Sequence, residues 1–243
     1  MSDFNTFEKL GESCEICVTK EHTFGTDAFL LADFAKARHK DIVCDLGTGC
    51  GIIAVLMRLR YEPKQVYGVD IQPQAIEQFE LTVSRSGLKE TYPLLMDLKA
   101  LTNDAPLGRC DLVTCNPPYK AAKAGIESEL SAHKIARHEI LCNISDVCAA
   151  GNKLLKYGGR LCLCNRPERL ADVMCAMRDN DIEPKYLRFV SKSPNDAPWL
   201  FLIEGRKGGG SFMQVLPQLY ISGSGGISPE LAQIYGKTDE RTE

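Results

Sequence analysis

The sequence contains no apolar run that approaches the roughly 18 residues needed for a membrane span. Residues 1–9 hold no basic stretch leading into an apolar one, so they do not resemble a secretion signal. Internal repeats are also lacking. These absences argue against a membrane-embedded protein and a repeat fibre, and they lead us to expect a cytoplasmic protein.

Residues spaced for a metal site are scarce. Eleven cysteines, an odd number, lie at irregular intervals, which favours reduced thiols over a disulfide framework. Cys14 and Cys17 form the one Cys-x-x-Cys pair, and none of the four histidines completes a zinc site by local spacing. We therefore expect plain thiols and no metal. Five cysteines in apolar runs are expected to be small core residues: Cys44, Cys110, Cys115, Cys162 and Cys164.

A basic surplus is missing as well. The net charge is −3, which by itself does not indicate nucleic-acid binding. Residues 151–210, however, carry 11 Lys and Arg against 7 Asp and Glu, so the rest of the chain is more acidic. This asymmetry would allow a polyanion to dock on one side of the molecule, although such an excess is also typical of an ordinary solvated surface.

The 243 residues, 44% of them apolar, are enough for one large domain. From residue 41 to about 190, short apolar runs alternate with helical periodicity, which is typical of βαβ units. The last two apolar runs are joined by a turn too short for a helical crossover, which predicts an antiparallel hairpin. The expected strands are Asp41–Leu46, Gln65–Ile71, Tyr92–Met96, Cys110–Cys115, Arg160–Cys164, Lys185–Val190 and Trp199–Glu204.

The fold class is therefore α/β, with a mostly parallel seven-stranded sheet and an antiparallel edge hairpin. Residues 1–40 are expected to form an N-terminal segment and a helix that pack on the core, 41–235 the main domain, and 236–243 a frayed tail. The expected helices include Ala28–Ala37, with Thr26 as its N-cap, Ile52–Arg60, one from Pro73 to Gly87, and Ile140–Lys156.

A glycine-rich loop, Gly47-x-Gly49-x-Gly51, directly follows the first predicted parallel strand and opens a helix. Glycines allow a ligand to approach the backbone closely, and the helix N-terminus offers unpaired N–H groups. A dinucleotide fingerprint would require its third glycine at Ile52, so a NAD-type pyrophosphate site is disfavoured. The loop predicts a different ligand that bears oxygen atoms.

Aspartates accompany the ends of three successive strands: Asp45, Asp70 and Asp97. A single carboxylate at a strand end is often a turn former. Three of them in register with a glycine loop instead indicate a ligand site at the carboxyl edge of the sheet.

The segment Asp45–Gly51 resembles motif I of the class I S-adenosylmethionine-dependent methyltransferases. The resemblance implies a Rossmann-like domain whose loop wraps the amino-acid part of S-adenosylmethionine. It further implies that Asp45 serves the ammonium or a bridging water, that Asp70 accepts the ribose hydroxyls, and that Asp97 contacts the adenine amino group. The candidate cofactor contacts are then Asp45, Gly47, Thr48, Gly49, Gly51, Asp70, Ile71, Asp97 and Asn116.

The segment Asn116-Pro117-Pro118-Tyr119, called the elbow below, follows the fourth predicted strand and so belongs to the same edge. Its prolines remove backbone donors and leave a rigid turn. The Asn116 side-chain oxygen and the Pro117 carbonyl could accept both N–H groups of a planar amine, freeing its lone pair to attack a methyl group. Tyr119 would stack on the amine's plane. A simple strand terminator is the alternative interpretation.

Several segments together resemble one family, the bacterial adenine-N6 methyltransferases of valine transfer RNA. That resemblance implies methylation of the adenosine 3′ of the anticodon, a tRNA partner and S-adenosylhomocysteine as product. It also implies that Gly25–Asp27 closes over the methionine end of the cofactor, which adds Thr26 and Asp27 to the candidate contacts. The matching segments are Phe24–Ala32, the glycine loop, the elbow, Ala136–Ile140, Leu202–Lys207 and Val215–Pro217.

Other acceptors stay open, because the elbow also resembles that of enzymes that methylate a glutamine amide of release factors or guanine N2 of ribosomal RNA. The chain lacks the Arg-Pro-Glu-Thr-Glu-like segment and helical N-terminal domain of the former and the longer, duplicated chain of the latter. An inactive RNA- or cofactor-binding module is the alternative that is not an enzyme. We hypothesise that phosphates of the RNA are held by cations flanking the site: Lys120, Lys123, Arg137, Arg206 and Lys207.

Overall fold

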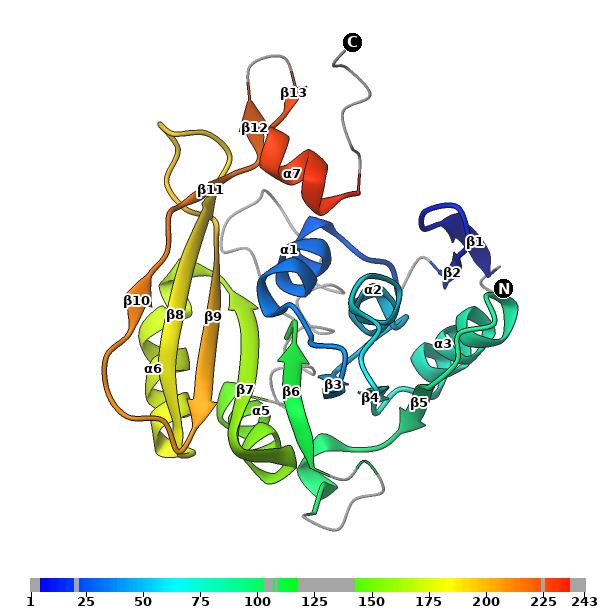
Figure 1. Ribbon diagram of the computed structural model, residues 1–243, viewed down its shortest axis with the longest axis horizontal. Coiled ribbons are helices and arrows are strands. Elements are labelled where there is room, and N and C mark those ends of the chain that lie inside the picture. Colours follow the sequence, from blue (N-terminus) through cyan, green and yellow to red (C-terminus); the bar gives the residue numbers. More distant parts are fainter. Residues whose placement is uncertain are drawn as a thin grey trace, which may run out of the picture.

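The computed structural model describes residues 5–19, 22–102, 107, 109–117, 143–223 and 226–236 (Figure 1). The elements are β1 Thr6–Lys9, β2 Glu15–Val18, α1 Thr26–Ala35, β3 Ile42–Leu46, α2 Ile52–Tyr61, β4 Gln65–Asp70, α3 Pro73–Arg85, β5 Thr91–Leu95, η1 Leu98–Ala100, β6 Cys110–Cys115, α5 Ile144–Leu154, β7 Leu155–Asn165, η2 Pro167–Arg169, α6 Leu170–Asp179, β8 Ile182–Ser191, β9 Leu200–Lys207, β10 Gln214–Val215, β11 Leu219–Tyr220, β12 Ser222–Gly223, β13 Gly226–Ile227 and α7 Pro229–Ile234.

The main sheet has the order β10-β8-β9-β7-β6-β3-β4-β5, and β11 also pairs with β8. Strands β3 to β7 are parallel to one another, whereas β9 is antiparallel to both β7 and β8. The predicted α/β class and the antiparallel β8–β9 pair are confirmed. The described sheet has nine strands where seven were expected, because β10 and β11 pair with β8 over two residues each. Segments that short show no alternating pattern in a sequence.

Helices cover both faces of the sheet, which makes three layers. The described core divides into two clusters, one between the sheet and α1, α2, α3 and α7, and one between the sheet and α5 and α6. Figure 1 shows α1 and α2 side by side over the middle of the sheet, in agreement with their mutual contacts. Strands β3 and β6 are almost entirely buried, as expected of parallel strands between two layers of helices.

Local signals explain where some of the helices begin. Pro73 occupies the first turn of α3, and Asn143 forms a capping box with Asp146 at the start of α5. Two expected boundaries are wrong. The N-cap of α1 is Gly25 rather than Thr26, and α5 ends at Leu154 because the following residues join β7. None of the described helices combines the length and the apolar character needed to cross a membrane.

The N-terminal hairpin of β1 and β2 packs on α3 rather than on the main sheet. The Cys17 backbone N–H donates to Thr82 Oγ1 at 2.9 Å, and that of Glu15 donates to Ser86 Oγ at 3.0 Å. Cys14 and Cys17 are buried as free thiols in this hairpin, and burial is the largest cause of their raised pKa values. The hairpin thus covers α3, the helix that also supports the glycine loop.

Candidate active site

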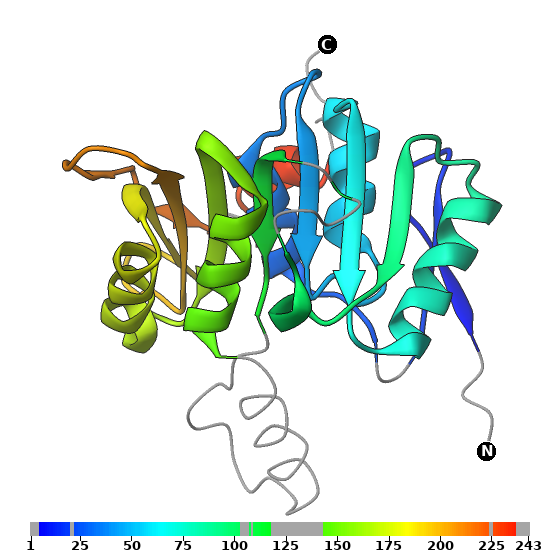
Figure 2. The same cartoon turned by 90° about the horizontal axis from the view of Figure 1, so that it is seen from below.

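The carboxyl ends of the central strands lie at one edge of the sheet. Leu46 at the end of β3 is paired with Val69 of β4 and with Cys115 of β6, and Asp70 is paired with Leu95 of β5. Figure 2 shows the arrowheads of β3 and β4 side by side. The segments that follow these strands, namely the glycine loop, the residues after β4 and β5, and the start of the elbow, therefore share this carboxyl edge.

The glycine loop uses its glycines in two ways. Gly47, Gly49 and Gly51 have φ angles of +65°, +56° and +85°, a region that favours glycine. A Cβ added to Gly51 would lie 2.2 Å from Phe79 Cδ2, so this glycine is required for packing. A Cβ added to Gly47 or Gly49 would meet no protein atom within 4 Å. These two glycines thus leave backbone open to a ligand, while Phe79 supports the loop from the α3 side.

Asp45 lies buried beneath the loop. Thr48 Oγ1 donates to its Oδ2 and Thr114 Oγ1 donates to its Oδ1, each at 2.7 Å. Burial raises the pKa of Asp45 to about 7, because the charged carboxylate loses its contact with water. The Thr48 and Thr114 hydroxyls lower the pKa, but by less than burial raises it, and the nearby Asp70 carboxylate raises it further. The two contacts of Asp45 thus join the glycine loop, through Thr48, to strand β6, through Thr114. The expected contact of Asp45 with the ammonium group of the cofactor, or with a bridging water, remains a prediction.

Asp70 connects the end of β4 to the glycine loop. Its Oδ2 accepts the Gly49 N–H and its Oδ1 accepts the Gln72 N–H, each at 2.9 Å. Each carboxylate oxygen can accept a further hydrogen bond, so Asp70 can hold the loop and still bind hydroxyl groups. Ile71 beside it is 49% exposed, which offers an apolar surface at this edge.

Asp97 follows β5 and caps the short helix η1, where its Oδ1 accepts the Lys99 N–H at 2.9 Å. This contact is the turn-forming role that the sequence left open. Asp97 also lies near the end of β5, at the carboxyl edge, so its predicted contact with the adenine amino group is kept as a proposal.

The N-terminal end of α1 belongs to the same edge. At the other end of this helix, the Ala35 carbonyl accepts from Arg160 Nη1 at 2.8 Å, in the part of β7 that precedes the carboxyl edge. A helix of ten residues is about 15 Å long, so α1 spans the sheet and brings Thr26 and Asp27 to the loop side. Thr26 Oγ1 shares a hydrogen bond of 2.7 Å with Tyr235 Oη, and Asp27 Oδ1 accepts the Ala28 N–H at 3.1 Å.

Asn116, the first residue of the elbow, is half-buried beside β7. The buried Cys164 thiol donates to Asn116 Oδ1 with a sulfur–oxygen distance of 3.0 Å. Pro117 follows directly, whereas Pro118 and Tyr119 lie outside the described residues. The thiol contact fixes the orientation of the amide that the sequence assigned to catalysis.

Sequence reasoning missed Thr114 and the polar role of Cys164. Thr114 is a buried polar residue near the end of the mostly apolar strand β6, which is a signal that could have been used. All five cysteines expected in the core are buried, Cys164 among them. Its contact with Asn116 depends on the register of β6 and β7, which pairs Cys115 with Leu163.

The proposed RNA-binding cations are not all at this edge. Lys120, Lys123 and Arg137 lie outside the described residues. The expectation that Arg206 and Lys207 flank the site is wrong, because β9 runs antiparallel and ends at the opposite, amino-terminal edge of the parallel strands. Lys207 Nζ there donates to the carbonyl groups of Asn152 and Leu155 at the end of α5.

Comparisons with known proteins agree with this geometry. The family model "Methyltransferase small domain" matches residues 19–169. Two relatives named tRNA1(Val) (adenine(37)-N6)-methyltransferase, from Aeromonas salmonicida and Porphyromonas gingivalis, are each 26% identical; the first covers 83% of both chains, the second 75% of this chain and 73% of its own.

Solved structures show the same fold. A predicted O-methyltransferase from Agrobacterium tumefaciens has a TM-score of 0.68 at 18% identity, covering 86% of this chain and 95% of its own. M. jannaschii TYW2 in complex with AdoMet has a TM-score of 0.55 at 15% identity, covering 85% and 87%. Because the family model spans more than half of the sequence and includes the glycine loop, the strand-end aspartates and the elbow, the chain belongs to the methyltransferase small domain family.

Proposed function

We propose that the protein uses S-adenosylmethionine to methylate N6 of an adenosine in RNA, namely the adenosine 3′ of the anticodon of tRNA(Val). The observation that carries the proposal is that the glycine loop, Asp70 and Asn116 share one edge of the sheet. The names of the relatives supply the acceptor, since they are tRNA1(Val) adenine-37 enzymes.

The residues at this edge fit the cofactor. Gly47 and Gly49 leave an open cradle of backbone, Asp70 keeps acceptor capacity for ribose hydroxyls, and Ile71 offers an apolar contact for a base. When bound, S-adenosylmethionine supplies an electrophilic methyl group. The other predicted contacts, Thr26, Asp27 and Asp97, lie at or near the same edge and complete the proposed cofactor site.

The elbow provides acceptors for the amine of the substrate. Asn116 Oδ1 and the Pro117 carbonyl would accept the two N–H groups of adenine N6, which favours a pyramidal nitrogen with a free lone pair. Cys164 uses one acceptor position of Asn116 Oδ1 and so leaves the other for the substrate. Transfer of the methyl group would break its bond to sulfur, release S-adenosylhomocysteine and leave the new carbon–nitrogen bond on a cationic nitrogen. The surplus proton of that nitrogen would be acidic enough to pass to solvent without a strong base. Tyr119 is proposed to stack on the base.

A target adenosine stacked in a loop must be turned out to reach these acceptors. A single-stranded anticodon loop makes this easier than opening a duplex, because no base pair is broken. The acceptor assignment therefore agrees with the chemistry of the elbow, which needs an exposed, planar amine.

Nucleoside mass spectrometry of undermodified tRNA, incubated with the protein and S-adenosylmethionine, tests the reaction. We expect N6-methyladenosine in tRNA(Val), whereas transfer to a release factor and not to tRNA would refute the proposed acceptor. In a parallel thermal-shift assay, S-adenosylhomocysteine should raise the melting temperature and NAD should not.

Two variants separate chemistry from cofactor binding. Asn116→Ala should retain S-adenosylhomocysteine affinity and lower kcat by roughly 10²- to 10³-fold, as expected for a lost transition-state contact. Asp70→Ala should chiefly weaken cofactor binding, because it also releases the Gly49 N–H. Asn180→Ala, at the end of α6, serves as the control and should leave both quantities unchanged. Equal losses of rate and cofactor affinity in Asn116→Ala would contradict its assigned role.

A further inference from the structure

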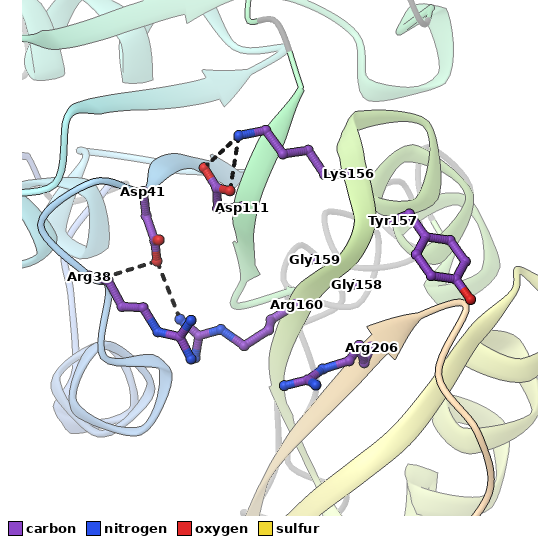
Figure 3. A pocket seen from close by; sticks show the side chains of 9 residues that line it. All are labelled: Arg38, Asp41, Asp111, Lys156, Tyr157, Gly158, Gly159, Arg160 and Arg206. Atoms are coloured by element: carbon purple, nitrogen blue, oxygen red, sulfur yellow. Dashed lines mark hydrogen bonds and ion pairs between the residues drawn. The ribbon is translucent and has the colours of Figure 1, made fainter.

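A polar hollow lies at the amino-terminal edge of the parallel strands, opposite the candidate active site. Its volume is about 120 Å³. Figure 3 shows the charged side chains that line it, contributed by the segment before β3, by β6, by β7 and by β9. We call this cavity the rear hollow, and its charged lining residues are Arg38, Asp41, Asp111, Lys156, Arg160 and Arg206.

The carboxylates of the rear hollow are already paired. Lys156 Nζ lies 3.0 Å from both oxygens of Asp111. Arg160 lies 3.5 Å from Asp41 and 3.2 Å from Glu204, and its side chain is only 12% exposed. Lys156 thus neutralises Asp111, whereas Arg160 is shared between Asp41 and Glu204, so these two cations face three carboxylates. Arg38 and Arg206 raise the number of cations in this cluster to four.

Among the described residues, the guanidinium groups of Arg38 and Arg206 form no ion pair with a carboxylate. The dashed line from Arg38 to Asp41 in Figure 3 marks the Arg38 backbone N–H, which donates to Asp41 Oδ2 at 3.0 Å. Both arginine side chains are exposed, so their guanidinium groups are accessible from solvent. In Figure 3 the side chain of Arg38 points toward that of Arg160 from the other side of the hollow. Like charges that face one another across a small cavity repel, and an anion between them would remove that repulsion.

The backbone of β7 keeps the rear hollow open. The register of β6 and β7 shifts between Cys110 and Leu112, so a bulge forms in β7 next to Asp111. Gly158 in this bulge has φ +78°, and a Cβ added there would meet no atom within 4 Å. Tyr157 is 82% exposed at the rim. The bulge therefore supplies an open backbone and an exposed aromatic ring beside the two arginines.

A second, wider hollow continues along the same edge. It lies where β3, β4 and β5 begin, and it is lined by the cations Lys40, Arg58, Lys64 and Lys89 with a single carboxylate, Glu62. Together the two hollows hold eight cations and three carboxylates, in a chain whose net charge is −3. We call this combined surface the basic edge. Its surplus of positive charge is concentrated away from the candidate active site.

We propose that the basic edge binds backbone phosphates of RNA, with one phosphate seated in the rear hollow between Arg38 and Arg206. A volume of 120 Å³ equals that of about four liquid waters, which is sufficient for a phosphate group. A free phosphate would use the rear hollow alone. The continuation of cations over the starts of three further strands instead matches a polyanion, and Tyr157 can stack on a base.

The distance between the two edges suits one RNA that reaches both. Strands of five or six residues are roughly 17–20 Å long, so the two edges lie about that far apart. The basic edge would therefore hold a part of the RNA that is remote from the modified nucleotide. The proposal takes from the proposed function only the choice of tRNA as the RNA to be tested.

The test compares two double variants of the full-length protein. Affinity for undermodified tRNA is measured by fluorescence anisotropy between about 50 and 200 mM salt, with no methyl donor present. Arg38→Ala/Arg206→Ala should weaken binding about three- to tenfold. It should also make the negative slope of log affinity against log salt shallower by about 0.7 to 0.9, as for the loss of one phosphate contact.

The matched control is Arg178→Ala/Arg188→Ala. It removes the same two charges, but from arginines that are already paired with Glu183 and Glu230. This control should retain the native salt slope. If the two double variants bind tRNA equally well and with equal slopes, the proposal is wrong.

A further variant tests the second hollow. Lys64→Ala/Lys89→Ala should independently make the salt slope shallower. An unchanged slope would contradict a continuous surface that binds a polyanion. Inorganic phosphate gives the competing outcome. If it raises the melting temperature of the native protein but not of Arg38→Ala/Arg206→Ala, while tRNA affinity is equal in both, the rear hollow takes a free anion instead.

Binding and methylation are scored separately. If the native protein methylates no tRNA, the proposed function fails, but the binding comparison of the double variants can still be made. If the native protein methylates tRNA and the variants bind it like their control, only the basic edge proposal fails.

Discussion

Replacing Asp45 by asparagine should remove a pH dependence from the stability of the protein. Asp45 is 1% exposed, and its oxygens accept hydrogen bonds from the Thr48 and Thr114 hydroxyls at 2.7 Å. An asparagine side chain has nearly the same shape, and its amide can accept from one hydroxyl and donate to the other. The substitution Asp45→Asn therefore removes the ionisation while leaving the loop its two partners.

The magnitude follows from the raised pKa. Asp45 has a pKa of about 7 in the folded protein against an ordinary value of 3.8. The folded state thus retains a proton that the unfolded state has lost, so stability is greatest below pH 3.8 and falls as the pH rises toward 7. Each pH unit in that window corresponds to about 1.4 kcal/mol. Between about pH 5 and pH 7, this one group should lower the free energy of unfolding by about 2 kcal/mol.

Urea denaturation of the native protein and of Asp45→Asn across this pH range measures the effect. The difference between the two free energies of unfolding isolates Asp45, because every other group is common to both. We expect the native protein to lose about 2 kcal/mol relative to the variant from pH 5 to pH 7, and little more above pH 8. A difference that is flat, or that rises with pH, would refute the argument from burial.

Thr114→Val provides a second measurement of the same site. It preserves the shape of the side chain but removes one hydroxyl that favours the ionised form of Asp45. The pH at which stability is lost should therefore move upward. An unchanged curve would mean that the Thr114 hydroxyl does not stabilise the carboxylate.

Two further predictions concern the loop and the elbow. Gly51→Ala would place a Cβ against the Phe79 ring at a residue with φ +85°, and it should lower the free energy of unfolding in urea by about 2–4 kcal/mol. The control Gly87→Ala has φ +59° but open space around the added Cβ, so it should cost only about 1 kcal/mol. Cys164→Ala should lower kcat by about fivefold without raising the KM for S-adenosylmethionine, and Cys164→Ser should restore it, because serine can donate the same hydrogen bond to Asn116. A loss in melting temperature with unchanged kcat would show that Cys164 is only a packing residue.

Much of the candidate site could be predicted because parallel strands end at a common edge. The glycine loop, Asp70 and Asn116 each follow a strand that the hydrophobic pattern marks clearly, and the structure places all three at the carboxyl edge. Arg206 and Lys207, at the end of β9, show the limit of this reasoning. Their strand was expected to be antiparallel, but the edge at which it ends follows only from its pairing with β7.

By itself, the sequence determined the α/β class, the glycine loop and the acidic and amide groups at the strand ends, because these depend on local periodicity and on residues adjacent in the chain. The tertiary structure alone decided that Thr114 donates to Asp45, that Cys164 donates to Asn116 and that Arg206 joins Arg38 in the rear hollow. Each of these contacts joins residues far apart in the sequence, whose meeting depends on the order, direction and register of the strands. Those properties are set by the packing of the whole sheet and its helices, and no local pattern records them.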